Sequence, residues 1–485
     1  MKKEPTGIDG FDEISKGGLN AGSINLISGR PGTGKTLFGI SFMFAGAERG
    51  EKGLFVTFEE SIENIIDNLD PSYVERLKKY HDKVLVNDIA TLRTKARMER
   101  ETIEVLNIDI IINSLQTQIN REGIKRVFID GLSALSVSLP SEEDYKRSVF
   151  LIFSLLRQMR VTTLITSEFV EAGRFSKSGY EEFLADSLIL LSKDGWKRYV
   201  EIIKMRGSDF TPGKHFLRIV SSGLIVYPRL RISGKGQRTN ERISTGIVGL
   251  DAMLSGGLLK GSTTLISGPS GVGKSIIGLE FLIHGAQLGE EGLMLTFEET
   301  PAAVEKNAQS FDWDIGKYEK EGKIKIIYGV GEFSFEELVY RIKEEIEKGE
   351  VKRFVFDSVT KFLEIYGTDV SMDALIDILR SKGITSMFTN EVSEILGSGC
   401  MSGLGMSVLM DTVITMRYVE LESHIGRAIL VLKMRGSMHD KKIREMKITS
   451  TGVEVLSPFV QYENILSGNP RKTPSERAKE FFEGL

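Results

Sequence analysis

Two glycine-rich segments of the same pattern, 239 residues apart, constrain the fold of this chain more than any other feature. Each fits G-x-x-x-x-G-K-[ST], the first over residues 29–36 and the second over residues 268–275. Glycines in this pattern let backbone N–H groups turn inward around phosphate oxygens, and the positive end of the following helix adds to the attraction. The pattern therefore predicts two phosphate-binding loops.

The sequence around each loop is typical of a strand before it and a helix after it. Lys35 and Lys274 are expected to reach the β- and γ-phosphates of ATP, and the hydroxyls of Thr36 and Ser275 to ligate Mg²⁺. The residues expected to bind ATP in the two loops are Gly29, Gly32, Thr33, Gly34, Lys35 and Thr36, and Gly268, Gly271, Val272, Gly273, Lys274 and Ser275.

Other segments are repeated together with the loops. Phe58-Glu59-Glu60 recurs as Phe297-Glu298-Glu299, again 239 residues later. A period this long indicates duplicated globular domains, so we expect two tandem α/β nucleotide-triphosphatase domains, each a mostly parallel sheet flanked by helices. The predicted boundaries are residues 1–230 for the first domain, 231–243 for a basic linker, 244–460 for the second domain, and 461–485 for a loop and short tail.

Composition narrows the class of protein. A hydrophobic content of 41% suits a globular chain with ample core. No run of 18 apolar residues and no N-terminal signal pattern is present, which argues against membrane insertion and secretion. The single cysteine fits a reducing cytoplasm, and the net charge of −4 gives no support to nucleic-acid binding.

Carboxylates end two predicted strands in each domain, where the ligand crevice of an open α/β sheet lies. Adjacent glutamates at the end of one strand suit the orientation of a water for attack on the γ-phosphate. A single Asp at the end of the other suits Mg²⁺ held mostly through water. The glutamates are Glu59, Glu60, Glu298 and Glu299, and the aspartates are Asp130 and Asp357.

A Lys-x-Arg segment recurs near the end of each domain, as Lys204 and Arg206 and as Lys433 and Arg435. Residues two apart on a strand share a face, so each pair suits clamping of phosphate oxygens. A solvated cationic strand face is an equally good interpretation of these residues alone.

The twin loops, the Phe-Glu-Glu segments, the segment 179–186 (GYEEFLAD) and the segment 433–437 (KMRGS) together resemble the KaiC family. These are two-domain, RecA-like ATPases and autokinases of the cyanobacterial clock, with relatives in other bacteria and archaea. The resemblance implies a homohexamer of two stacked rings with ATP between neighbouring subunits. It implies that the glutamate pairs act as bases and that the Lys-x-Arg residues contact the nucleotide of the adjacent subunit.

The chain departs from that family in two places. The family phosphorylates a neighbouring Ser and Thr in its second domain, whereas here Ser407 is followed by Val408. We therefore expect at most single-site autophosphorylation, at Ser407. The tail ends soon after Pro470, which puts a KaiA-like partner in doubt, and a KaiB-like or other signalling partner stays open.

Two other functions remain open from the sequence. A RecA- or DnaB-like DNA motor shares this core, and the nearest basic cluster, residues 93–100, is interleaved with acidic residues and resembles a solvated helix face. The second is a protein scaffold that bound ATP stabilises by mass action, and such a scaffold would need no ATP hydrolysis.

Overall fold

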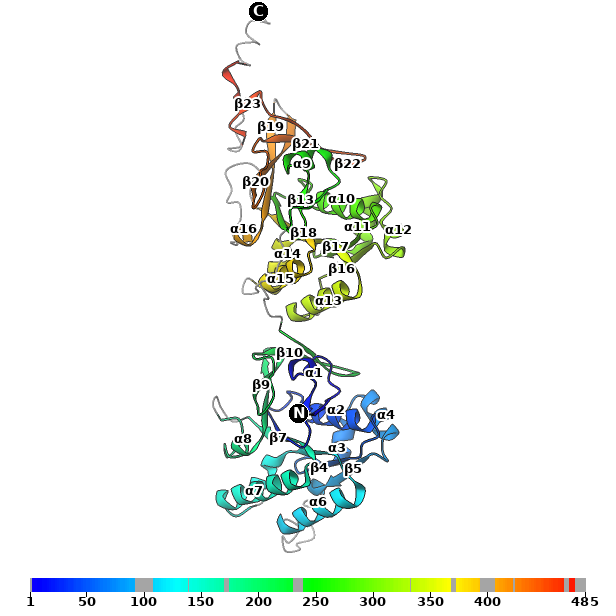
Figure 1. Ribbon diagram of the computed structural model, residues 1–485, viewed down its shortest axis with the longest axis vertical. Coiled ribbons are helices and arrows are strands. Elements are labelled where there is room, and N and C mark those ends of the chain that lie inside the picture. Colours follow the sequence, from blue (N-terminus) through cyan, green and yellow to red (C-terminus); the bar gives the residue numbers. More distant parts are fainter. Residues whose placement is uncertain are drawn as a thin grey trace, which may run out of the picture. The chain divides into compact units, whose positions relative to one another are not determined.

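Two units make up the structure, a computed structural model in which the chain divides into Met1–Arg229 and Leu230–Leu485. The residues that it describes are 2–91, 108–137, 139–169, 174–229, 239–331, 333–367, 372–392, 406–421, 424–465 and 471–475. Within this part of the chain, each unit has its own nine-stranded sheet (Figure 1).

The sheet of the first unit has the order β11-β10-β9-β8-β3-β7-β6-β4-β5. The six neighbouring strands β8, β3, β7, β6, β4 and β5 are parallel to one another. The remaining strands, β9, β10 and β11, each pair antiparallel with their neighbours. The strands are β3 (Ile24–Gly29), β4 (Gly53–Thr57), β5 (Val84–Asp88), β6 (Arg126–Asp130), β7 (Thr162–Glu168), β8 (Ser187–Asp194), β9 (Lys197–Met205), β10 (His215–Val220) and β11 (Gly223–Tyr227).

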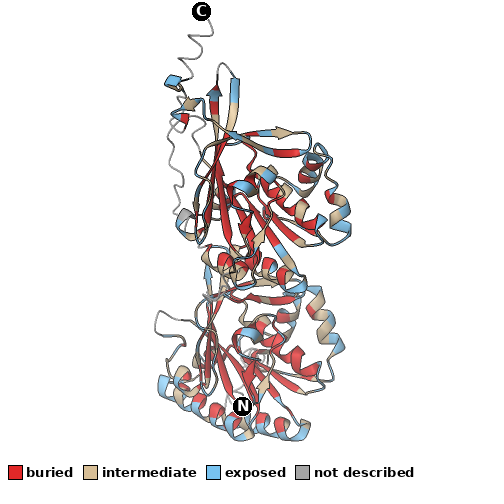
Figure 2. Cartoon of the chain, turned by 45° about the horizontal axis from the view of Figure 1, so that its top comes forward, coloured by how far each residue is buried: buried red, intermediate tan, exposed pale blue. Residues whose placement is uncertain are grey.

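Helices cover both faces of this sheet, and the alternation of side chains along each strand decides which face a residue serves. Phe55 and Phe128 pack in one apolar cluster with α2 (Lys35–Ala47). Their neighbours Leu54 and Val127 belong to a second cluster with α6 (Ile108–Glu122) and α7 (Glu142–Met159). Because both faces are covered, the parallel strands are continuously apolar rather than alternating, and Figure 2 shows them buried along most of their length.

The second unit repeats this architecture, with the order β16-β15-β17-β18-β14-β19-β20-β21-β22. Its strands are β14 (Thr263–Gly268), β15 (Glu291–Thr296), β16 (Ile324–Tyr328), β17 (Val351–Asp357), β18 (Thr385–Glu391), β19 (Thr412–Leu421), β20 (His424–Met434), β21 (Arg444–Thr449) and β22 (Gly452–Pro458). Its longer helices are α10 (Lys274–Gln287), α11 (Pro301–Gln309), α13 (Phe335–Lys348), α14 (Val359–Tyr366) and α15 (Asp373–Ser381).

Short elements complete both units. They are β1 (Lys3–Glu4), α1 (Phe11–Ile14), β2 (Leu19–Asn20), α3 (Ile62–Asp67), α4 (Pro71–Lys79), η2 (Leu132–Val137), α8 (Glu181–Leu184), β12 (Arg242–Ile243), α9 (Val248–Met253), β13 (Leu258–Leu259), α12 (Ile315–Lys320), α16 (Met406–Leu409), β23 (Tyr462–Glu463) and β24 (Arg471–Lys472). Strand β12, at the end of the predicted linker, pairs with β13 of the second unit.

The predicted fold class is confirmed: both units are mostly parallel sheets between helices. The carboxyl ends of the parallel strands meet at one edge of each sheet, which is where ligands bind in such folds. None of the described helices is long and apolar enough to cross a membrane.

Candidate functional sites

The first phosphate-binding loop joins the carboxyl end of β3 to α2. Gly32 and Gly34 have φ angles of 74° and 104°, a region that residues with a Cβ rarely enter. The Lys35 ammonium is folded over its own loop, where it donates to the carbonyls of Gly29 (2.8 Å) and Arg30 (3.3 Å). Burial lowers the pKa of Lys35, and nearby carboxylates oppose that shift. The Lys35 side chain therefore closes the loop through hydrogen bonds to its carbonyls.

Asp130, at the end of β6, lies directly beside this loop. Its carboxylate accepts hydrogen bonds from Thr36 Oγ1 (2.9 Å) and Thr166 Oγ1 (2.6 Å). Burial raises the pKa of Asp130, while the two hydroxyl donors favour its charged form. The structure thus brings the predicted metal-ligating hydroxyl and carboxylate into contact.

Glu59 and Glu60 follow β4, the strand next to β6. The Phe58 N–H donates to the Asp130 carbonyl at 3.0 Å, which ties the two strand ends together. Burial raises the pKa of Glu59, and the charges of Glu168 and Asp130 raise it further. A Cβ on Gly131 would lie 2.6 Å from the Glu59 Cβ, so a glycine is needed there for this approach.

The second site repeats these relations. The Lys274 ammonium, 8% exposed, donates to the Pro269 carbonyl at 2.8 Å. Asp357, at the end of β17, accepts hydrogen bonds from the Thr389 and Ser275 hydroxyls, which oppose the rise in pKa that burial causes. The loop hydroxyl again contacts the strand-terminal aspartate.

The glutamates of the second site are held more closely than those of the first. Ser358 Oγ donates to Glu298 Oε1 at 2.6 Å, and Asn307 Nδ2 donates to Glu299 Oε2 at 2.9 Å. The residue that corresponds to Ser358 in the first domain is Gly131, which has no side chain to donate. The two sites therefore share their loop residues and predicted metal ligands but differ around the candidate base.

The residues at each loop fit Mg-ATP. Mg²⁺ takes oxygen ligands and keeps several waters, so one hydroxyl and one carboxylate beside a phosphate loop match its usual binding. Among the described residues, no group of three or more His, Cys, Asp and Glu side chains could enclose a metal ion by itself. A metal held jointly with the phosphates of a nucleotide is consistent with this donor set.

The Lys-x-Arg pairs lie away from their own loops. Lys204 pairs with Leu188 of β8, which is level with Leu26 near the amino end of β3. Lys433 likewise pairs with Val413, which is level with Leu265 of β14. Each loop begins three residues further along its strand, about 10 Å away, so the cations lie toward the opposite edge of the sheet.

The sequence reasoning missed four residues at the loop edge. Thr166 and Thr389 donate to Asp130 and Asp357, the predicted metal ligands. Glu168 and Glu391 end β7 and β18, in register with the first glycine of each loop, Gly29 and Gly268. A signal was present, because Thr-x-Glu recurs at a spacing of 223 residues.

Two more residues, missed as well, contact the loops from strands on the β9 and β19 side of each sheet. Arg198 of β9 donates from Nε to the Gly32 carbonyl at 3.3 Å. Tyr418 of β19 donates to the Ser270 carbonyl, also at 3.3 Å. Both contacts join segments far apart in sequence, so no local pattern points to them.

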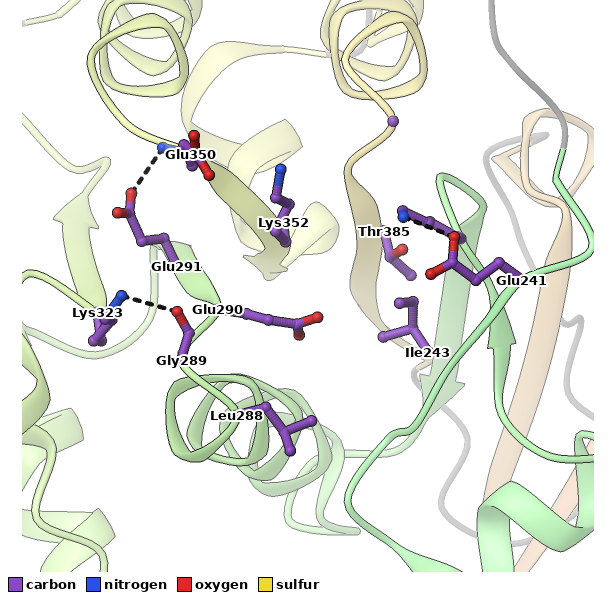
Figure 3. A pocket seen from close by; sticks show the side chains of 12 residues that line it. Glu241, Ile243, Leu288, Gly289, Glu290, Glu291, Lys323, Glu350, Lys352 and Thr385 are labelled. Carbon is purple, nitrogen blue, oxygen red and sulfur yellow. Dashed lines mark hydrogen bonds and ion pairs between the residues drawn. The ribbon is translucent and has the colours of Figure 1, made fainter.

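A charged hollow in the second unit lies at the other edge of the sheet, where β15, β17 and β18 begin (Figure 3). Carboxylates and ammonium groups both line it, among them Glu241, Glu290, Lys260 and Lys352. Because the loop is at the carboxyl edge, this hollow is not the nucleotide site.

Other predicted features fall partly outside the described residues. Ser407 lies in α16, and its side chain is not described. The basic cluster at residues 93–100 and most of the predicted linker also lie outside the described residues.

Comparison with known proteins agrees with this geometry. The sequence model of the KaiC ATPase family matches residues 4–231 and again residues 243–459. The circadian clock oscillator protein KaiC of Thermostichus vulcanus is 34% identical over 496 residues, which is 99% of this chain and 94% of the relative. The protein of the same name from Nostoc sp. is 33% identical over 494 residues, with the same coverage. The chain therefore belongs to the KaiC family of ATPases.

Proposed function

We propose that both domains, residues 1–230 and 244–460, hydrolyse ATP with Mg²⁺ at the two loops. The observation that carries this proposal is the contact, in each domain, between the loop hydroxyl and the strand-terminal aspartate beside a pair of glutamates. A bound Mg²⁺ would supply charge neutralisation on the phosphates. Lys35 and Lys274 would exchange their loop carbonyls for phosphate oxygens, and Glu59 and Glu298 would accept a proton from the attacking water.

Turnover of ATP in the purified protein tests this assignment. We expect phosphate release to require Mg²⁺ and to fall about 100-fold or more when Glu59→Gln/Glu60→Gln is combined with Glu298→Gln/Glu299→Gln. Each pair changed alone separates the contributions of the two domains. Wild-type turnover in the fourfold variant would refute the roles of the glutamates.

The proposal includes a double-ring homohexamer with ATP between neighbouring copies. It is supported by the position of Lys204, Arg206, Lys433 and Arg435, which lie toward the opposite edge of the sheet from their own loops. A cation supplied across a subunit boundary can stabilise the charge that develops on the transferred phosphate. A ring of head-to-tail contacts gives every loop one neighbour to supply it.

Mixing two inactive variants tests for supply by a neighbour. In a Lys274→Ala background, Lys35→Ala and Lys204→Ala/Arg206→Ala should each abolish turnover. When the two variants are mixed in equal amounts, the rings should regain about a quarter of the activity. An active site needs an intact loop on one subunit and intact cations on its neighbour, and chance brings these together at about one interface in four. No recovery after verified subunit exchange would refute the arrangement.

We also propose that the second domain phosphorylates Ser407, and that partners of the KaiB type or other signalling proteins bind according to nucleotide state. The neighbouring Val408 has no hydroxyl, so one phosphate per chain is expected. Intact mass after incubation with Mg-ATP, beside Ser407→Ala, is the test. Equal phosphate on both proteins, or none on either, would refute Ser407 as the acceptor.

A further inference from the structure

A buried carboxylate in the first domain takes no part in the mechanism above. Glu181 is 0% exposed and accepts hydrogen bonds from three hydroxyls, those of Tyr145 (2.5 Å), Ser176 (2.9 Å) and Ser178 (2.6 Å). A hydrogen bond to a charged group is stronger than one between neutral groups, and an unsatisfied buried carboxylate is costly. The three donors therefore fix the Glu181 side chain in one position.

Glu181 is the first residue of α8, and the carbonyls of α8 hold the two cations of the first Lys-x-Arg segment. Lys204 Nζ donates to the Glu182 carbonyl at 2.8 Å, and Arg206 Nη2 donates to the Phe183 carbonyl at 3.3 Å. The last carbonyls of a helix have no partner within it, so they are available to cations. The position of α8 thus determines where both cations lie.

We propose that Glu181 is a positioning residue for Lys204 and Arg206. Through its three hydroxyl donors it fixes α8, and α8 in turn places the cations toward the nucleotide of a neighbouring copy of the chain. This inference rests on the proposed supply of these cations across a subunit boundary. It adds the residue that sets the positions of these two cations. A displacement of a catalytic group by about 1 Å can lower the rate by up to 100-fold.

The second domain has a different residue at the position of Glu181. Counting back from Asp186 and from the equivalent Asp411, the counterpart of Glu181 is Met406, which cannot accept hydroxyl donors. Its cations nevertheless bind carbonyls of the corresponding segment, with Lys433 donating to Met410 (2.8 Å) and Arg435 to Val408 (2.9 Å). Within the described residues, no carboxylate of the second domain takes the place of Glu181.

The test uses full-length protein in a Lys274→Ala background, so that phosphate release reports the first domain. Glu181→Gln and Tyr145→Phe change the hydroxyl cluster while leaving the cations and the loop intact. Glu51→Gln is the matched control, because it breaks a buried ion pair with Arg126 (2.7 Å), whose other hydrogen bonds go to the carbonyls of Pro5 and Phe42 and not to α8. Both kcat and KM for ATP are measured, together with the thermal midpoint.

We expect kcat to fall about tenfold in Glu181→Gln and by a smaller factor in Tyr145→Phe, with KM within about twofold of the parent. Glu51→Gln should lower the thermal midpoint without lowering kcat. If kcat is unchanged in Glu181→Gln and Tyr145→Phe but falls in Lys204→Ala/Arg206→Ala, the positioning role of Glu181 is refuted and the proposed cation supply is not. Unchanged kcat in the variant without the cations would refute the proposed cation supply and this inference together.

Discussion

Replacing Glu290 by Gln should destabilise the second unit strongly, because Glu290 neutralises a buried arginine. Arg353 is 1% exposed, and its Nε lies 2.6 Å from Glu290 Oε2. Its Nη1 donates to the carbonyls of Ser244 (2.8 Å) and Phe281 (2.9 Å), and the guanidinium lies 4.5 Å from the centroid of the Phe281 ring. These contacts hold the cation in place when its counter-charge is removed.

The expected loss follows from the charges. Two unit charges about 4 Å apart attract by about 4 kcal/mol at an effective dielectric constant of about 20. The amide oxygen of Gln can still accept from Arg353, which returns about 1 kcal/mol. The net loss of about 3 kcal/mol agrees with the range found when one partner of a buried ion pair is removed.

A matched control is available at the same hollow (Figure 3). Lys260 and Glu241 form an ion pair at 2.7 Å, but their side chains are 39% and 58% exposed. The same carboxylate-to-amide change, Glu241→Gln, should therefore cost less than about 1 kcal/mol. The two variants differ mainly in burial of the pair.

Fluorescence of Trp313 can report the second unit alone. The chain has two tryptophans, Trp196 in the first unit and Trp313 in the second, so a Trp196→Phe background isolates the signal. In urea, Glu290→Gln should lower the midpoint by about 1 M or more, given slopes of about 2–3 kcal/mol per M. A shift no larger than that of Glu241→Gln would refute the reasoning.

Three further predictions use the same readouts. Glu280 is half-buried beside β22 and accepts a hydrogen bond from the Val453 N–H at 2.9 Å, and its partial burial raises its pKa to about 7. Its folded-state pKa thus exceeds the unfolded value, so stability falls as pH rises from about 4.5 to 7. Glu280→Gln should stabilise the second unit at pH 8 and have little effect at pH 5, as measured by thermal unfolding followed through Trp313 fluorescence. An equal effect at the two pH values would contradict this. Gly39→Ala would place a Cβ 2.0 Å from the Phe128 ring, and it should lower the urea midpoint reported by Trp196, whereas an unchanged midpoint would show that the ring can move. Mg-ADP at 100 times its Kd should stabilise each unit by about 2.7 kcal/mol, and Lys35→Ala should remove the effect from the Trp196 signal only.

Much of the fold was predictable because its signals are local. The loop glycines, the apolar strands and the long repeat all lie in short stretches of sequence, and the two nine-stranded sheets confirm the predicted class. The contacts between Thr36 and Asp130, and between Ser275 and Asp357, join the carboxyl ends of two strands that have one strand between them. They follow from the meeting of the carboxyl ends of parallel strands at one edge of the sheet, where ligands bind in such folds.

The parts that were missed depend on neighbours distant in sequence. Thr166 meets Asp130 across two strands 36 residues apart in the chain, and Arg198 reaches Gly32 from 166 residues away. Glu181 was part of a recognised segment, but its burial depends on Tyr145 from α7. A hydroxyl or a carboxylate in a sequence does not show which tertiary partner will satisfy it.

The differences between the two domains lie around the loops rather than in them. In the first domain, Gly131 leaves the approach to Glu59 without a donor, and Glu181 fixes the segment that holds the cations. In the second, Ser358 donates to Glu298, and Met406 stands where Glu181 would be. The residues predicted to bind the phosphates and the metal recur in both domains. The residues around the candidate base and at the segment that holds the cations differ between the domains. We therefore expect the two domains to differ more in kcat than in nucleotide affinity. Nucleotide binding and turnover, measured on Lys35→Ala and on Lys274→Ala, test this expectation.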